Sequence, residues 1–547
     1  MAHNRTEIIR EITLTALDEI VEENEARIAA GKPIMTTAEV QDKIITDVRT
    51  EIELENAILP KGSKMDKYNS LAPAQVAWII ARLHPVKLIV TANAGSDGEY
   101  ALLGVYQDSG EKSGIYDTSE KAVRDLARTY NALISIHDVK EMIAVLRDAV
   151  DTVYPCNEKN LIAVNNGIFD YDTKQLLPFT PEKVFLSKCK VNYNPVVQNI
   201  TIHNDEDGTD WDVESWMNSL SDDAEVVNTL WEVIGAIVRP LVPWNRSAWF
   251  YSEKGNNGKG TLCELMRELC GDGTYVSIPL AEMGKDFMLE PLTHASAIIV
   301  DENDVGTFID KAANLKAIIT GDVIQINRKF KIPVSYKFRG FMVQCLNEMP
   351  RIKDKSDSFF RRQLFIPFTK CFTGIERKYI KQDYLHRQEV LEYVLYKVLN
   401  MSYYELSTPE VCEEALKEYK EYNDPIRQFA NDILPNCVWD LLPFCFLYDL
   451  YREWYSVQIP TGSPEGNRSF IKNLKQIVDS DFGDKWEEVQ ENVKEYMNKP
   501  EPLVREYGLI FKWGNPRYIA SYDDDKACVP VHLQQKYRGL LRKKNNI

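Results

Sequence analysis

The 547-residue sequence has no pair of cysteines at CxxC spacing, although it contains ten cysteines. Structural zinc sites and dithiol redox motifs usually need that spacing, so we expect neither of them. Several cysteines stand inside apolar runs, such as Cys345 in FMVQCLN. These cysteines are expected to be reduced thiols in a hydrophobic core.

Long apolar runs are also missing. No stretch approaches the ~20 consecutive apolar residues that a membrane helix needs, so we expect no membrane partner. The first residues lack the apolar centre of a signal peptide and predict an amphipathic helix instead. We therefore expect a cytoplasmic protein.

Basic residues are fewer than acidic residues. The chain has 65 Lys and Arg residues against 82 Asp and Glu residues, which gives a net charge of -17. This balance argues against a protein coated in nucleic acid. It does not exclude binding through local basic clusters, because phosphates respond to the local field.

The middle of the chain carries the pattern of an α/β domain. Three short apolar runs, SAWFY, SAIIVD and GFMVQCLN, are separated by helical patterns from Ser247 onward. Such runs are typical of buried parallel strands. Upstream, VKLIV and ALLGVY predict two strands, and the length of the chain predicts three or four domains.

A phosphate-binding loop is predicted after the first of these runs. The sequence SEKGNNGKGT leads into a helical pattern, and glycine and asparagine allow backbone N–H groups to turn inward at a helix N-terminus. Lys259 is expected to be partly exposed and to reach the phosphates. The alternative is a tight strand–helix turn with a solvated lysine. The predicted loop residues are Gly255, Asn257, Gly258, Lys259, Gly260 and Thr261.

This loop departs from the usual GxxxxGK[ST] pattern at two positions. Glu253 stands at the first glycine position, and Gly260 follows the lysine where a hydroxyl is usual. Thr261 follows one residue later and could supply a metal-ligating oxygen, or it could bond back to helix carbonyls. Alternatively, water takes the coordination position of that hydroxyl, and Asp301 is the ligand that the protein supplies to the metal.

Polar residues follow the next two apolar runs. Asp301 and Glu302 end one strand-like run, where a metal-binding carboxylate and a base that polarises water are expected. Asn347 ends the other run and could sense a γ-phosphate. Arg361 and Arg362 could stabilise phosphoryl-transfer charge, often across a subunit boundary. Each motif also has a non-catalytic alternative. Asp301 and Glu302 could form a solvated acidic turn, Asn347 could cap a turn, and the two arginines could be a surface pair.

The motifs in this order resemble the superfamily 3 helicases, and within them the branch of phage, plasmid and poxvirus primase-helicases. TGDVIQINRKFK is similar to the family's TGD followed by a basic hairpin. NNGIFDYDTKQLLPFTPE is similar to the domain before the ATPase, and LPFCFLYDLYREWY with SFIKNLKQIV resembles the C-terminal winged helix. The resemblance covers the chain from about Leu161 to about Val478.

The resemblance implies an α/β fold class. An AAA+-like core with a parallel sheet would follow a mixed α+β and helical N-terminal region and precede a winged-helix-like domain. The expected parts are an N-terminal domain of unknown role at 1–155, a pre-helicase domain at 156–225, the ATPase domain at 226–375, and a helical linker with the C-terminal domain at 376–547.

The resemblance also implies an ATP-hydrolysing DNA helicase. It would form a homo-hexameric ring with ATP and Mg²⁺ at subunit boundaries and single-stranded DNA in the channel. A phage or mobile genetic element would use it for replication in the host cytoplasm. The implied roles are catalytic for Glu302, Asn347 and Arg362, with Arg361 in reserve, metal-binding for Asp301 and Thr261, and DNA-binding for Arg328, Lys329 and Lys331.

The sequence does not predict a primase, and it leaves a second DNA-related function open. An N-terminal primase is not expected, because Asp97, Glu99, Asp108 and Glu111 lie in turn-rich sequence and are expected to be solvated. The runner-up function is an origin-binding initiator that melts DNA locally. The basic residues that would contact origin DNA are Lys536, Arg538, Arg542, Lys543 and Lys544, for which a disordered basic terminus is the alternative.

Overall fold

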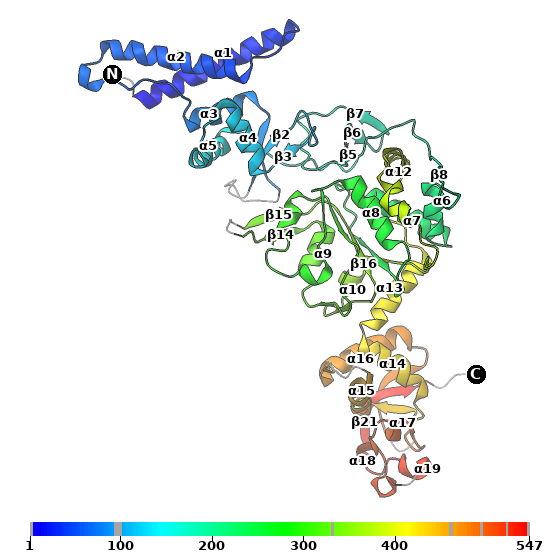
Figure 1. The fold of residues 1–547 in the computed structure, drawn as a ribbon. Helices are drawn as coiled ribbons and strands as arrows, with labels where there is room; N and C mark the ends of the chain where they lie inside the picture. The colour runs from blue at the N-terminus through cyan, green and yellow to red at the C-terminus, as the bar shows by residue number, and fades with distance from the viewer. Residues whose placement is uncertain are drawn as a thin grey trace. The chain divides into compact units, whose positions relative to one another are not determined.

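The computed structural model describes residues 4–91, 101–329, 333–458, 463–492, 496–520 and 523–543. These residues fall into two compact units, 1–413 and 414–547, which are described separately (Figure 1). No helix among the described residues is long and apolar enough to cross a membrane. Asp97, Glu99, Lys331 and Lys544 lie outside the described residues.

The first unit begins with the predicted amphipathic helix. α1 (Arg5–Ala29) and α2 (Thr37–Ile58) both start at a capping box, in which the side chain of Asn4 or Thr36 accepts a backbone hydrogen bond. α3 (Pro73–Leu83), α4 (Glu120–Tyr130) and α5 (Ile136–Ala149) follow around a four-stranded sheet of order β3-β2-β1-β4. Its strands are β1 (Val86–Ile89), β2 (Leu102–Tyr106), β3 (Tyr116–Asp117) and β4 (Thr152–Val153).

The two strands predicted in this region are confirmed as the antiparallel pair β1 and β2, in which Val86 faces Val105. A small antiparallel meander follows at residues 161–177. Asp108 and Glu111 are exposed after β2, as expected for solvated acids. The next elements are β5 (Leu161–Val164), β6 (Gly167–Asp170), β7 (Gln175–Leu177), β8 (Ile202–Asn204), β9 (Thr209–Trp211), α6 (Val213–Ser219) and α7 (Ala224–Val238).

A five-stranded parallel sheet forms the centre of this unit, in the order β11-β12-β16-β10-β18. The apolar runs predicted as buried strands are confirmed as β10, β12 and β16, since nearly all of their residues are buried. The strands are β10 (Ser247–Tyr251), β11 (Tyr275–Val276), β12 (Ala297–Val300), β16 (Phe341–Leu346) and β18 (Gln363–Pro367).

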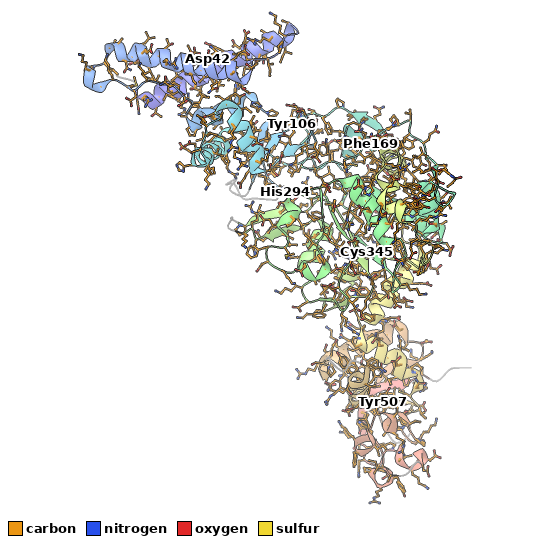
Figure 2. All side chains as sticks on the ribbon, viewed as in Figure 1. Asp42, Tyr106, Phe169, His294, Cys345 and Tyr507 are labelled. Carbon is orange, nitrogen blue, oxygen red and sulfur yellow. The ribbon has the colours of Figure 1, made fainter. Side chains whose placement is uncertain are left out.

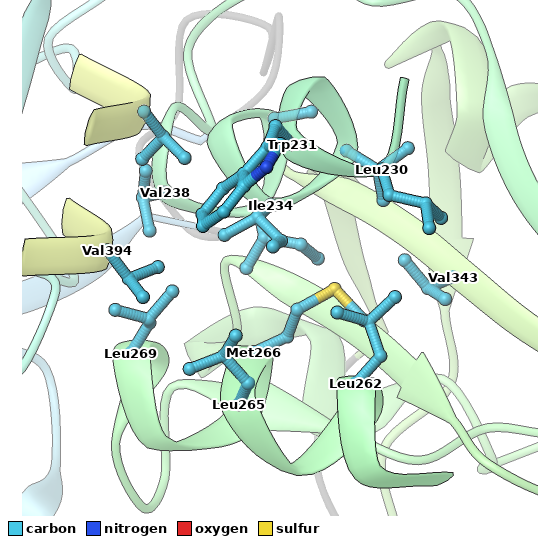
Figure 3. Close-up of a cluster of buried hydrophobic side chains, with 14 of the residues drawn as sticks. Leu230, Trp231, Ile234, Val238, Leu262, Leu265, Met266, Leu269, Val343 and Val394 are labelled. Carbon is cyan, nitrogen blue, oxygen red and sulfur yellow. The ribbon is translucent and has the colours of Figure 1, made fainter. Parts of the chain in front are cut away.

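Helices pack against the sheet through apolar side chains. Leu262 and Met266 of α8 (Lys259–Cys270) meet Leu230 and Ile234 of α7 in a cluster that Val343 of β16 completes (Figure 3). Burying each such side chain stabilises the fold by roughly 1.5–3 kcal/mol. This packing fixes where α8 begins.

The remaining elements of the unit are α9 (Ala313–Thr320), β13 (Phe308–Ile309), β14 (Val323–Ile326), β15 (Val334–Lys337), β17 (Arg351–Ile352), α10 (Asp357–Phe360), α11 (Lys378–Gln382), α12 (Gln388–Asn400) and α13 (Glu410–Tyr422), which continues into the second unit.

The second unit runs helix, strand, two helices, strand, three short helices and a final strand around a core that includes Trp439 and Trp454. The two predicted helices are confirmed as α15 and α16, and the three strands pair in the order β19-β21-β20. Its elements are α14 (Pro425–Ile433), β19 (Leu441–Pro443), α15 (Phe444–Gln458), α16 (Asn467–Asp481), β20 (Trp486–Asn492), α17 (Leu503–Glu506), α18 (Ile510–Trp513), α19 (Asp524–Ala527) and β21 (Lys536–Arg542).

The basic C-terminal segment is part of this sheet. Strand β21 contains Lys536, Arg538 and Arg542, so a disordered basic terminus is the wrong interpretation for residues 536–542. Arg538 pairs with Glu488 at 2.6 Å, and Arg542 pairs with Asp440 at 3.2 Å. These ion pairs engage two of the cations that the origin-binding hypothesis needs.

The cysteines occupy the positions that their apolar neighbours indicated. All ten are free thiols, and eight of them are buried. Cys345 lies near the carboxyl end of β16 and is labelled in Figure 2, and its sulfur is 3.4 Å from that of Cys263 in α8. Burial raises the pKa of Cys345 well above its usual value, which makes this thiol a weak nucleophile.

Candidate nucleotide-binding site

The predicted phosphate loop connects the carboxyl end of β10 to the first turn of α8. Gly258 has φ +90°, and a Cβ atom there would lie 2.6 Å from Leu220 Cδ2, so only glycine fits. Helix α8 starts at Lys259, and its N-cap makes no side-chain hydrogen bond. The Lys259 N–H donates to Asn257 Oδ1 at 3.3 Å, whereas the N–H groups of the next residues in the first turn meet no capping side chain, as anion sites at helix N-termini require.

Lys259 is buried, with 5% of its surface exposed, so the expectation of a partly exposed side chain was wrong. Its Nζ donates hydrogen bonds to the carbonyl oxygens of Ser252 at 3.1 Å and Leu346 at 2.9 Å, and to Asn347 Oδ1 at 2.9 Å. Neighbouring strands β10 and β16 end beside each other and enclose the ammonium group. Burial lowers the pKa of Lys259.

The structure brings the acidic motif to the same edge of the sheet. Asp301 and Glu302 directly follow β12, which pairs with β16, and both are exposed. Asp301 Oδ1 lies 3.0 Å from Arg267 Nη2 of α8. Partial burial acts to raise the pKa of Asp301, but the bond and charge of Arg267 outweigh it and hold that pKa below its usual value.

Asn303 anchors this acidic turn, and sequence reasoning missed it. Its buried side chain donates to Gln344 Oε1 at 2.9 Å and to the Cys345 carbonyl at 3.1 Å. Its Oδ1 accepts a bond from the Leu280 backbone at 2.9 Å. These bonds hold Asn303, and with it the turn that carries Asp301 and Glu302, against β16. An amide immediately after the Asp-Glu pair was the only sequence signal for it.

A segment after β18 covers the phosphate loop, a contact that no sequence motif predicted. The Phe372 N–H donates to the Asn256 carbonyl at 2.7 Å, and Asn256 Nδ2 donates to Glu376 Oε1 at 2.8 Å. Lys381 of α11 reaches the first turn of α8, since its Nζ would lie 3.8 Å from a Cβ at Gly260. A further cation thus stands where phosphates would be bound.

Thr261 is half-buried in the first turn of α8. Among the described residues its hydroxyl has no hydrogen-bond partner, so it does not bond back to the helix carbonyls. Asp301, Glu302 and Thr261 offer hard oxygen donors of the type that Mg²⁺ prefers, and this donor set fits that ion.

The two arginines lie at the opposite edge of the sheet. The Ser247 N–H, at the start of β10, donates to the Arg362 carbonyl at 2.8 Å. The Arg362 side chain donates to the carbonyl of Ser358 and, at 2.9 Å, to its hydroxyl. Arg361 is exposed, and its guanidinium has no bonding partner in the described part of the chain. The length of a strand therefore separates both arginines from Lys259.

The predicted hairpin is confirmed as β14 and β15, in which Ile326 faces Val334. Gly321 ends α9 in the left-handed conformation, with φ +64°, and turns the chain into β14. Arg328 and Lys329 follow β14 toward the tip, and Lys329 is exposed. Lys331, the third predicted DNA-binding residue, lies outside the described residues.

Three families match parts of the chain. Residues 73–222 match the D5 N terminal like family, residues 421–506 match the poxvirus D5 protein-like family, and residues 250–362 match a family of unknown function. A curated relative, "Putative helicase L207/L206" of Acanthamoeba polyphaga mimivirus, is 23% identical over 374 residues. The match spans 61% of this chain but only 37% of that relative.

Solved structures of low similarity were also found. An apo structure of the NrS-1 C-terminal region is 14% identical, with a TM-score of 0.38, over 75% of this chain and 86% of that chain. A second apo structure of the region is 14% identical, with a TM-score of 0.39, over 78% and 98% of the two chains. The two D5-type family matches and the mimivirus relative confirm the resemblance of the sequence to the phage and viral superfamily 3 primase-helicases.

Proposed function

We propose that this protein hydrolyses ATP with Mg²⁺ and uses the energy to unwind DNA as a homo-hexameric ring during replication of a phage or mobile element. The observation that carries the proposal is the separation of two groups of residues across one parallel sheet. Lys259, Asn347 and the Asp301–Glu302 pair converge at the carboxyl edge, and the arginines lie at the amino edge. A ring that places the amino edge of one copy against the carboxyl edge of the next would complete each site.

The arrangement of strands supports an AAA+-like core. Numbered along the chain, β10, β11, β12, β16 and β18 become strands one to five, and the sheet order is two-three-four-one-five with all pairs parallel. The nucleotide then sits where β10 ends, as ligands do in open parallel sheets.

The second unit supports a winged-helix assignment, because a helix, a strand, two helices and a strand share one core with β21, which follows three short helices and pairs with both other strands. Origin binding through the basic residues of β21 is not proposed as the main task, since Glu488 and Asp440 already pair with two of them. ATP hydrolysis and strand displacement by the purified chain test the proposal.

In this mechanism Lys259 and the first turn of α8 hold the phosphates, and Asp301 with Thr261 would hold the metal ion. Mg²⁺ supplies charge neutralisation at the phosphate oxygens. Glu302 orients and deprotonates the attacking water, and Asn347 places the polar contact beside the γ-phosphate. Arg267 positions Asp301, and Asn303 positions the turn that carries both carboxylates.

Replacing Glu302 with glutamine should leave ATP binding intact and slow hydrolysis by ~10²–10⁴-fold, because the amide keeps the shape and loses the basicity. Single-turnover hydrolysis and nucleotide binding by the same preparation measure the two effects. Asp304→Asn is the matched control, since Asp304 is also exposed in this turn. A rate within a factor of two of wild type would remove Glu302 as the base and make Asp304 the next candidate.

Replacing Thr261 with alanine should raise the Mg²⁺ concentration needed for half-maximal ATPase activity, because a ligating oxygen is lost, whereas Thr261→Ser should preserve it. Gly260→Ser in the alanine background is expected to restore activity, since a Cβ at Gly260 would meet only Lys381 Nζ at 3.8 Å. An unchanged Mg²⁺ titration for Thr261→Ala would favour a water-filled shell in which Asp301 is the protein ligand.

Replacing both Lys329 and Lys331 with alanine should reduce DNA-stimulated ATPase activity and unwinding while basal ATPase activity persists. Lys329 follows β14 of the hairpin, both lysines stand far along the chain from the phosphate loop, and cations bind the DNA backbone. Lys121→Ala, an exposed lysine on α4, serves as the control. Full unwinding by the double variant would exclude the hairpin lysines from the mechanism.

A further inference from the structure

Three metal-ligating side chains meet where α8 contacts the 3₁₀ helix η4 (Tyr384–His386), which follows α11. Glu264 and Glu268 are four residues apart on α8, so their carboxylates lie on the same face of the helix. His386 ends η4 and brings its imidazole to them. One ligand atom from each side chain lies within 4.8 Å of the other two.

The imidazole of His386 is oriented as in a metal-binding histidine. Its Nε2 atom lies 3.0 Å from the Lys381 carbonyl oxygen. Because a carbonyl only accepts hydrogen bonds, Nε2 carries the proton, and Nδ1 of the neutral ring keeps a free lone pair. Metal-ligating histidines commonly donate their other ring N–H to a backbone carbonyl in this way. The lone pair of Nδ1 is therefore available to a metal ion.

The distance between Nδ1 and the nearest carboxylate matches two ligands of one ion better than a hydrogen bond. Nδ1 of His386 lies 3.3 Å from Glu268 Oε1. A charge-assisted hydrogen bond would be about 2.7–2.9 Å long, and His203 makes such a bond to Asp210 at 2.7 Å. A tetrahedral zinc ion with bonds of about 2.0–2.2 Å holds neighbouring ligand atoms roughly 3.3–3.6 Å apart.

Each carboxylate is also held from outside the cluster. Lys190 Nζ donates to Glu268 Oε2 at 3.3 Å, and Arg267 Nη1 donates to Glu264 Oε2 at 3.3 Å. Ligating carboxylates are commonly hydrogen-bonded by such outer partners, which orient them toward the metal. The two glutamate side chains are only 22% and 21% exposed, so this packing fixes their positions.

We propose that Glu264, Glu268 and His386 bind one divalent transition-metal ion, with Zn²⁺ as the expected occupant. The imidazole selects such an ion over Mg²⁺, which takes oxygen ligands, so this site and the donors beside Asp301 bind different metals. Water takes the fourth position, as in open zinc sites. The ion ties the segment that contains Lys381 to α8, whose first turn Lys381 approaches. This binding does not depend on ATP hydrolysis.

Calorimetric titration of the full-length, nucleotide-free protein with Zn²⁺ in excess Mg²⁺ tests the site. We expect one saturable site per chain, which Glu268→Gln and His386→Ala each weaken by at least ~10–100-fold, since loss of an outer partner alone typically costs that much. His203→Ala is the matched control, because it removes an exposed imidazole beside Asp210 and should bind Zn²⁺ as the wild type does. Circular dichroism of the metal-free variants establishes that they fold.

Two further measurements identify the ligands and the effect of the ion. Co²⁺ bound in place of Zn²⁺ should show d–d absorption without the charge-transfer band of a thiolate ligand. Zn²⁺ should slow amide hydrogen exchange at residues 378–387 in the wild type and in His203→Ala, but not in His386→Ala, because the ion joins this segment to α8.

Three results would overturn the inference and leave the proposed function untouched. These are the absence of saturable Zn²⁺ binding, binding that Glu268→Gln and His386→Ala retain at wild-type affinity, and a thiolate band in the Co²⁺ spectrum. In the first case a protonated His386 beside Glu268 accounts for the contact. In the other two cases the metal belongs to a different set of side chains.

Discussion

Lys259→Ala should abolish ATP hydrolysis. The Nζ atom of Lys259 stands between the ends of β10 and β16 and bonds Asn347, so a phosphate that enters the loop meets this ammonium group first. Without it, Arg267 and Lys381 remain as the counter-charges that act on Asp301 among the described residues. Turnover of purified protein at saturating ATP and Mg²⁺ measures the loss.

This substitution also removes a buried group. Ser252 and Leu346 each lose a donor for a carbonyl oxygen, and each such loss costs about 1–3 kcal/mol of stability. Thermal melting therefore has to accompany the assay. Lys254→Ala, an exposed lysine in the same loop, is the control and should keep both stability and turnover. Near wild-type turnover by folded Lys259→Ala protein would contradict the ATPase assignment.

Loss of the arginine that reaches the neighbouring nucleotide should lower kcat by ~10³–10⁵-fold. The family resemblance assigns this role to Arg362, with Arg361 in reserve. The two side chains differ in their present contacts. Arg362 has to break its hydrogen bonds to Ser358 before it can reach a phosphate, whereas Arg361 is exposed. Separate Arg362→Ala and Arg361→Ala variants therefore decide between them.

Subunit mixing reveals the side on which the arginine acts. Arg362→Ala subunits mixed with Lys259→Ala subunits should regain part of the activity where an intact pair of faces meets. Strict absence of recovery in confirmed mixed rings would argue that the arginine acts within its own subunit, or that Arg361 is the residue concerned. Ser358→Ala is a useful companion, because it removes the hydroxyl acceptor of Arg362 without touching either arginine.

Local sequence patterns predicted the elements of the core but not their order. The apolar runs that became β10, β12 and β16 are buried on both faces, and such strands are readable as continuous hydrophobic segments. The insertion of β16 between β10 and β12 depends on pairing with residues 95 positions away in β10 and 44 positions away in β12. No local pattern encodes that pairing.

The residues of the site also divide into those that local patterns predicted and those that they did not. Lys259 and Asn347 were predicted from separate motifs, and the fold brings them within hydrogen-bonding distance. Burial of Lys259, the anchoring by Asn303 and the cover from Phe372 could not be predicted, because each depends on a neighbouring element that is distant in sequence. For β21, the alternation of exposed Lys536 and Arg538 with buried Tyr537 and Gly539 was a strand signal that the charge pattern obscured.

The most direct test of the central claim is strand displacement by the purified full-length protein on tailed DNA duplexes of both polarities, with ATP and Mg²⁺. The account predicts displacement of one polarity that requires hydrolysable ATP and disappears in Lys259→Ala and Glu302→Gln. Arg128→Ala, which removes an exposed cation from α4, should unwind as the wild type does. Displacement that persists without ATP, or ATP hydrolysis with no displacement on either duplex, would contradict the account of this protein as an ATP-driven DNA-unwinding motor.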